Sequence, residues 1–164
     1  MTPGPPADRR TRGFTLIELV ITLAIVGLLA SAAFPLASMA IRREKETELR
    51  SALREIRTAI DAYKDAAGRG RIQVPADASG YPPSLQVLAD GVEDAGSPDK
   101  RMIYFLRRVP RDPFFPDGSV AAADTWGLRS YASPPDDPQP GDDVYDVYSL
   151  APGAGIGGVP FRDW

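Results

Sequence analysis

Residues 12–19 of this 164-residue chain read RGFTLIEL, and the 28 residues of Phe14–Ile41, FTLIELVITLAIVGLLASAAFPLASMAI, contain one charged side chain, Glu18. An α-helix rises 1.5 Å per residue, so this run predicts an apolar helix of about 42 Å, enough to cross a hydrocarbon core of about 30 Å. Three arginines precede it, between residues 9 and 12. Basic residues before a membrane span stay cytoplasmic, so the rest of the chain is expected across the membrane.

After the apolar run the helical pattern continues, but only one face is apolar. The apolar positions recur at spacings of four and three: Leu49, Leu53, Ile56, Ile60, Tyr63 and Ala67. This spacing is typical of an amphipathic helix, and Glu46 and Arg50 form an i,i+4 pair on its polar side. One helix is therefore predicted from about Thr15 to Ala67, with Gly68 and Gly70 as stop signals. Pro35 lacks a backbone donor and clashes with the preceding turn, so a kink or local melting is expected there.

The remainder of the chain predicts a small mixed domain. Residues 84–88 indicate a short helix capped by Ser84, and residues 102–109 fit either a short strand or an irregular segment. Residues 128–133 and 144–150, rich in tyrosine and valine, predict two strands. The sequence between them, PPDDPQPGDD, consists of turn-forming residues, so an antiparallel hairpin is expected. The predicted fold class is α+β, a long N-terminal helix packed on a small antiparallel sheet.

The amino-acid composition argues against several classes of function. The chain has no cysteine and no histidine, which excludes disulfides, zinc–thiolate sites and catalysis by Ser-His-Asp or Cys-His groups. The net charge of −3 is uneven, because residues 42–71 carry nine basic and six acidic side chains, whereas residues 72–164 carry seven and fourteen. Nucleic-acid-binding domains usually present a basic surface. Neither an enzyme nor a nucleic-acid-binding protein is therefore expected.

The stretch RGFTLIEL, with the apolar run and Pro35 behind it, resembles the type IV prepilin signal that pilins share with type II secretion pseudopilins. The resemblance implies that a membrane aspartyl peptidase cuts after Gly13 and then methylates the amine of Phe14. It also implies that Glu18 guides assembly. Pro35 matches the proline at which helices in assembled filaments lose their regular winding.

Glu18 is a functional candidate on chemical grounds as well. A carboxylate inside an apolar segment costs on the order of several kcal/mol in lipid unless it is paired. Cleavage after Gly13 would create an ammonium group at Phe14, at nearly the same depth. A pair between Glu18 of one copy and the amine of another would satisfy both charges and fix the axial stagger of neighbouring copies.

Two plainer interpretations stay open. Glu18 could snorkel towards the interface of a simple single-span anchor. Alternatively, the arginines and the apolar run form an ordinary secretory signal peptide, cut at Ala-Ser-Ala of residues 30–32. Glu18 within the run, and the helix that continues beyond it, argue against a signal peptide. The first residue of the mature protein separates the three interpretations, since it would be Phe14, Ala33 or Met1.

The second half of the chain indicates a subgroup. Four segments occur in an order similar to that of the major pseudopilin, the G-type subunit, of the type II secretion system: VPRDPF at 109–114, DTWG at 124–127, YASP at 131–134 and DVYSL at 146–150. A glycine-rich tail follows. The absence of cysteine also suits a pseudopilin, because many type IV pilins close a C-terminal loop with a disulfide.

Major pseudopilins commonly bind calcium in the loop after the DVxS strand, through carbonyls, a serine and several aspartates. Here the loop reads SLAPGAG and has no acidic residue, which leaves Ser149 and Asp163 as the calcium ligands carried over from the family. Calcium needs about six to eight oxygens, usually with more than one carboxylate, so the chain departs from the family's pattern. The aspartates between residues 136 and 146 are interpreted as a solvated turn. Phe161 and Trp164 are expected to pin the tail instead.

The resemblance implies three parts: a leader at 1–13, a transmembrane and filament-core helix at 14–41, and a periplasmic domain at 42–164. It implies a structural subunit of a type II secretion system, anchored by a single pass in the bacterial inner membrane. Such subunits assemble into a periplasmic pseudopilus that drives protein export. The expected partners are copies of the chain itself, minor pseudopilins, the inner-membrane assembly platform and the prepilin peptidase.

Two other functions stay open at this point. One is a type IV pilus subunit or minor pilin for adhesion, motility or DNA uptake. The other is a membrane-anchored enzyme or binding domain, which would need a carboxylate-based site in a chain without histidine or cysteine.

Overall fold

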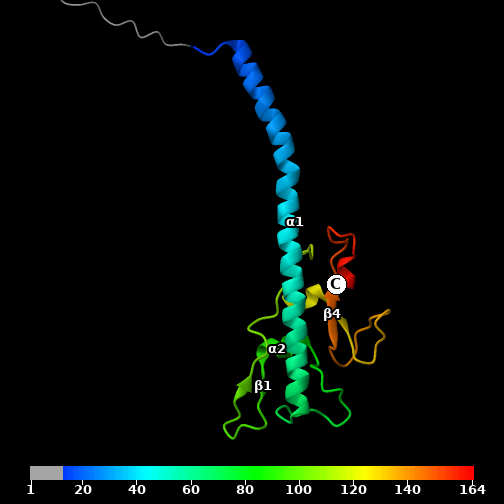
Figure 1. Ribbon diagram of the computed structural model, residues 1–164. Helices are drawn as coiled ribbons and strands as arrows, with labels where there is room; N and C mark the ends of the chain where they lie inside the picture. Colours follow the sequence, from blue (N-terminus) through cyan, green and yellow to red (C-terminus); the bar gives the residue numbers. More distant parts are fainter. Residues whose placement is uncertain (1–12) are drawn as a thin grey trace, which may run out of the picture. The chain divides into compact units, whose positions relative to one another are not determined.

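The computed structural model describes residues 13–164, except for the side chains of residues 32–36 (Figure 1). The chain divides into two units, Met1–Ile41 and Arg42–Trp164, and each is described by itself. The predicted leader lies outside the described residues apart from Gly13, and so does the side chain of Pro35.

One helix, α1 (Leu16–Gly68), begins and ends within one residue of the predicted bounds. Because α1 is continuous across position 35, the local melting expected at Pro35 is not seen in the backbone. After the last turn, Gly70 has a φ of 71°, and the amide of Arg71 donates to the carbonyl of Ala66 at 2.9 Å. Glycine adopts this left-handed conformation without the steric cost that a Cβ brings, so it ends the helix.

The core of the second unit is built on the predicted apolar stripe of α1. The five stripe residues from Leu49 to Tyr63 are buried, and Ala67 is partly buried. They pack against buried side chains from the rest of the domain: Leu85, Leu88, Leu106, Trp126, Val144 and Val147. The amphipathic helix is therefore confirmed, and burial of each large side chain contributes roughly 1.5–3 kcal/mol.

The predicted short helix is also confirmed. Helix α2 (Leu85–Asp90) begins at Ser84, whose hydroxyl accepts a hydrogen bond from the amide of Val87 at 3.4 Å. Leu85 and Leu88 face the core. In Figure 1, α2 and β1 (Val92–Glu93) lie beside the green end of α1.

The predicted hairpin is confirmed, with shorter strands. β3 (Trp126–Arg129) pairs antiparallel with β4 (Asp146–Ser149). The expected bounds of 128–133 and 144–150 were wrong at both ends, since β3 begins two residues earlier, at Trp126, and both strands stop short of the loop. Near the loop, the amide of Ser130 donates to the carbonyl of Gln139 at 3.0 Å and so leaves the ladder.

The small sheet is in fact two separate pairs of strands. β1 pairs antiparallel with β2 (Met102–Ile103), and β3 with β4. The undecided segment 102–109 is a strand only at its first two residues. Two short 3₁₀ helices, η1 (Ala122–Thr125) and η2 (Phe161–Asp163), complete the elements of the described chain.

Over the residues whose placement is described, no helical stretch is both long and apolar enough to cross a membrane. The membrane-spanning helix at 14–41 stays a prediction.

Candidate functional site

The site that the sequence points to lies at the start of α1. Gly13, Phe14 and Thr15 precede the first helical residue, Leu16. The peptide bond between Gly13 and Phe14, where cleavage is predicted, thus lies outside the helix. Proteolysis concentrates in such exposed, non-helical segments near chain ends.

Thr15 caps α1 and so determines where Glu18 lies. Its hydroxyl accepts a hydrogen bond from the amide of Glu18 at 3.3 Å, and its carbonyl accepts one from the amide of Leu19 at 3.2 Å. Glu18 therefore lies in the first turn, where the helix dipole favours a negative charge. Thr15 and Glu18 have the spacing of a capping box, so the assembly motif also contains a local signal for the start of the helix.

The apolar side chains that follow are exposed around the whole helix. Phe14 is 81% exposed and Leu16 84%, and Ile21 and Ile25, the least exposed of the large apolar side chains up to Leu29, are still 53% exposed. A helix that is apolar on every side is normally surrounded by lipid or protein. This surface is therefore the part of α1 that the predicted membrane or neighbouring subunits would cover.

The tail after β4 is held against α1 by a set of polar contacts that we call the tail clamp, made by Arg42, Glu46 and Arg57. The Arg42 guanidinium donates to the carbonyl of Ala154 at 2.6 Å, and Glu46 Oε1 accepts from the amide of Ile156 at 2.6 Å. The predicted pair of Glu46 with Arg50 is present, with a nitrogen–oxygen distance of 3.7 Å. Glu46 is nevertheless only 5% exposed, so it lies under the tail and not on an open polar face.

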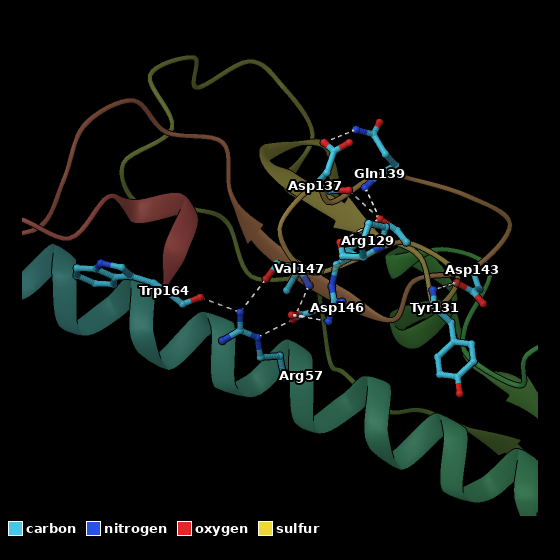
Figure 2. Close-up of polar contacts among 11 residues, drawn as sticks. Arg57, Arg129, Tyr131, Asp137, Gln139, Asp143, Asp146, Val147 and Trp164 are labelled. Carbon is cyan, nitrogen blue, oxygen red and sulfur yellow. Dashed lines mark hydrogen bonds and ion pairs between the residues drawn. The ribbon is translucent and has the colours of Figure 1, made fainter.

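Arg57 supplies the third part of the tail clamp (Figure 2). Its Nε donates to Asp146 Oδ1 at 2.8 Å, and its Nη2 donates to the main-chain oxygens of Val147 at 3.0 Å and Trp164 at 2.8 Å. One guanidinium thus joins α1, β4 and the last residue. Its planar, forked geometry suits three acceptors at once, which a lysine could not match.

Aromatic packing fixes the same tail. Phe161 is 2% exposed and stacks on Phe114, with ring centroids 4.2 Å apart. Trp164 packs edge-on against Phe161, and the Arg50 guanidinium lies 4.2 Å from the centroid of its indole ring. The expectation that Phe161 and Trp164 pin the tail is confirmed.

The two residues expected as calcium ligands, Ser149 and Asp163, lie in different surroundings. Ser149 is 1% exposed, and its hydroxyl donates to Asp112 Oδ2 at 2.5 Å. The other carboxylate oxygen of Asp112 accepts from the amide of Phe114 at 2.8 Å. Asp163 is exposed and lies 3.8 Å from the Arg162 guanidinium. Among the described residues, no three acidic, histidine or cysteine side chains are grouped so that they could hold a metal ion.

Asp112 is a site residue that the sequence patterns did not indicate. Asp112 is 1% exposed, and its carboxylate accepts a hydrogen bond from the hydroxyl of Ser149, which lies 37 residues further along the chain. A buried carboxylate is costly unless hydrogen bonds satisfy it, and here the two donors do so. The motif VPRDPF contains it, but no local pattern indicates its partner.

The acidic residues of the hairpin divide into two groups. Asp146 is drawn inward, since it pairs with Arg57 and also with Arg129 at 3.6 Å. Asp136, Asp137 and Asp142 are exposed in the loop between β3 and β4, as the interpretation of a solvated turn predicts, whereas Asp143 is half-buried and accepts a hydrogen bond from the amide of Tyr131 at 2.8 Å.

Among the groups with shifted pKa values are Asp94, Arg71 and Tyr81. A hydrogen bond from Arg71 lowers the pKa of Asp94, and the same ion pair raises the pKa of Arg71. Burial raises the pKa of Tyr81, which is further raised by Tyr145 and Tyr131 nearby. These groups stabilise loops and show no arrangement of an acid, a base and a nucleophile.

A capped helix start with a single glutamate, an exposed apolar helix surface and a small α+β head resemble the features expected of a type IV prepilin-like protein. In agreement, residues 8–34 match the family model described as the prokaryotic N-terminal methylation motif.

The resemblance to pseudopilins extends over nearly the whole chain. The chain is 27% identical over 154 residues to type II secretion system core protein G of Dickeya chrysanthemi, and the aligned region covers 90% of this chain and 92% of that protein. The chain is also 28% identical over 142 residues to core protein G of Klebsiella pneumoniae, and the aligned region covers 83% of this chain and 94% of that protein. The resemblance to the major pseudopilin is thereby confirmed.

Similarity to pilins is confined to a shorter stretch. The type IV major pilin protein PilA of Myxococcus xanthus is 46% identical over 54 residues, which cover 33% of this chain and 24% of that protein. No solved structure matches the chain.

Proposed function

We propose that this chain is a pseudopilin of a type II secretion system, which assembles through its N-terminal helix into a periplasmic filament that drives protein export. The observation that carries the proposal is the extent of the similarity to core protein G, which includes both the helix and the head. Similarity to type IV pilins covers only 33% of the chain.

The proposed processing follows from the start of α1. The prepilin peptidase cuts between Gly13 and Phe14 and methylates the new amine, which keeps a positive charge. Glu18 of one subunit then pairs with the amine of Phe14 of a neighbour. The exposed apolar surface from Phe14 to Leu29 contacts lipid before assembly and other helices afterwards. Helices and lipid tails are similarly apolar, so a polar pair is what makes the contact between subunits specific.

The remaining parts of the proposal concern place and partners. The chain sits in the inner membrane by a single pass, with residues 42–164 in the periplasm. Its partners are other copies, minor pseudopilins and the inner-membrane assembly platform. It acts mechanically and is a substrate of the peptidase, without catalysing a reaction itself; the chain has neither histidine nor cysteine.

Mass spectrometry of the protein from a host with the secretion machinery tests the processing. The expected N-terminus is N-methylated Phe14. A chain that starts at Ala33 would show a signal peptide, and one that keeps Met1 would show a plain anchor. Deletion of the gene should abolish protein export. Loss of twitching motility with normal export would replace the proposal by a type IV pilin.

Glu18→Gln tests the assembly pair, because it removes the charge and keeps the shape. Insertion and cleavage should continue while incorporation into filaments falls. Glu44→Gln is the matched control, since Glu44 is an exposed carboxylate of the same helix that makes no ion pair among the described residues. Equal filament yields for the two variants would contradict a role for the charge of Glu18.

A further inference from the structure

A groove between α1 and the tail combines apolar surface with positive charge. It has a volume of about 350 Å³, and we call it the arginine groove; its lining is Arg50, Leu53, Arg54, Arg57, Gly157, Val159 and Trp164. Leu53 is buried at its base. Val159 is half exposed, and the Trp164 indole lies under the Arg50 guanidinium.

The positive charge of the arginine groove is not balanced within the subunit. Arg57 is committed to Asp146 and to main-chain oxygens. Arg50 has Glu46 as its carboxylate partner, and Arg42 shares that carboxylate. Arg54 is exposed, and in the described part of the chain it pairs with no carboxylate. The arginine groove therefore suits a partner that brings both carboxylates and apolar surface.

The loop between β3 and β4 has this composition. Residues 134–143, PPDDPQPGDD, contain four prolines and four aspartates and no basic residue; we call them the Pro/Asp loop. Eight of its ten residues are exposed. None of its aspartates forms an ion pair with a described cation, in contrast to Asp146 next to it. The loop lies outside the lining of the arginine groove of its own chain.

The Pro/Asp loop is held by hydrogen bonds to the residues that flank it. The amide of Gln139 donates to the Ser133 hydroxyl at 2.7 Å. The amide of Tyr131 donates to Asp143 Oδ1 at 2.8 Å (Figure 2). Gly141 lies so close to Ser130 that an added Cβ would be 2.8 Å from the serine Cβ. An ordered loop loses less conformational entropy on binding than a flexible one.

We propose that the arginine groove of one subunit holds the Pro/Asp loop of a second copy of this chain. Proline rings pack well on aromatic surfaces such as Trp164, and carboxylates make charge-assisted hydrogen bonds with the guanidiniums of Arg50 and Arg54. The two surfaces are different parts of the chain, so the contact is head-to-tail, and such contacts generate open helical filaments when they do not close into a ring. The inference rests on the proposed function, because it supplies a second contact within the same filament.

Charge reversal and rescue test the contact in full-length protein, in cells that assemble the filament. Arg54→Asp should reduce filament yield on the order of fivefold, since it replaces an exposed attraction by a repulsion. Asp136→Arg alone should reduce it similarly, and the double variant should restore it. A double variant as defective as the single ones would overturn the proposal.

Thiol cross-linking identifies the occupant, because the chain has no cysteine of its own. With a short bis-maleimide, R54C and D136C introduced into separate copies should give dimers of this chain. G118C replaces D136C in the control, since Gly118 has open space around it, and should give none. Cross-links from R54C to a different protein, or no dimers while filaments still form, would overturn the inference.

The two levels of the proposal fail in different ways. Normal processing at Phe14 and normal export without the cross-link would leave the pseudopilin function intact and remove the Pro/Asp contact. Absence of processing and of any export defect would remove the pseudopilin function itself.

Discussion

Glu46 offers the sharpest test of how the tail is held. Its carboxylate is 5% exposed and accepts the amide of Ile156 at 2.6 Å, and two half-exposed guanidiniums lie 3.7–4.0 Å from its oxygens. Glu46→Ala leaves the Ile156 amide without its acceptor under the tail. Glu46→Gln keeps an acceptor and removes only the charge.

The contacts of Glu46 determine how much each substitution lowers the free energy of tail opening. A hydrogen bond to a charged group contributes about 1.5–3 kcal/mol, whereas ion pairs with half-exposed arginines contribute up to about 1 kcal/mol in total because solvent screens them. We expect Glu46→Ala to lower the free energy of tail opening by about 2–3 kcal/mol and Glu46→Gln by about 1 kcal/mol. Glu55→Ala is the control, since Glu55 is exposed on the same helix.

Hydrogen exchange of the full-length protein in detergent measures this opening directly. A loss of about 2–3 kcal/mol speeds exchange of the Ile156 amide roughly 30- to 150-fold if exchange occurs by local opening. The order should be Glu46→Ala fastest, then Glu46→Gln, with Glu55→Ala close to the wild type. Equal exchange in all four proteins would refute the reasoning, because the tail would then be held without Glu46, by the contacts of Arg42 and Arg57 and by aromatic packing.

Three further predictions concern other parts of the domain. An alanine Cβ at Gly127 would lie 2.2 Å from the Tyr148 ring opposite it in the hairpin. Gly127→Ala should therefore lower the free energy of unfolding, measured in urea, by about 1–3 kcal/mol. Gly118 has open space around it, so the control Gly118→Ala should change that free energy by less than about 0.5 kcal/mol. The Arg71 hydrogen bond lowers the pKa of Asp94. The stability that this pair contributes to the folded state is therefore present above the ordinary carboxyl pKa of about 3.9 and is lost as pH falls through the lowered value. The difference in melting temperature between wild type and Asp94→Asn should shrink in that window, and a constant difference would argue against the pair. Millimolar calcium or a chelator should leave the melting temperature unchanged, because the loop after β4 lacks acidic residues and its serine is committed to a buried carboxylate; a rise with calcium concentration would reveal a site that binds the folded state.

Local sequence patterns account for much of the fold. The apolar spacing from Leu49 to Tyr63 predicted both the helix and its buried face, and α1 ends one residue from the predicted position. Ser84 predicted the start of α2. These signals work because helix periodicity and capping act between residues a few positions apart. The methylation motif is local in the same sense, so a few neighbouring residues are enough to indicate the class of protein.

Local patterns were less successful in predicting the strands. Two-residue strands such as β1 and β2 are too short to show an alternation of apolar and polar residues. The hairpin was predicted, but its bounds were not, because the departure of Ser130 from the ladder depends on a hydrogen bond with the loop.

By itself, the sequence determined the long helix, the small head and the resemblance to prepilins, since periodicity, composition and a motif of eight residues are properties of neighbouring positions. Only the tertiary structure decided how the tail is held and where an unbalanced charge faces solvent. The amide of Ile156 meets Glu46 across 110 residues, and Ser149 meets Asp112 across 37. Pairings at such separations are set by how the whole domain packs, and no short-range pattern encodes them.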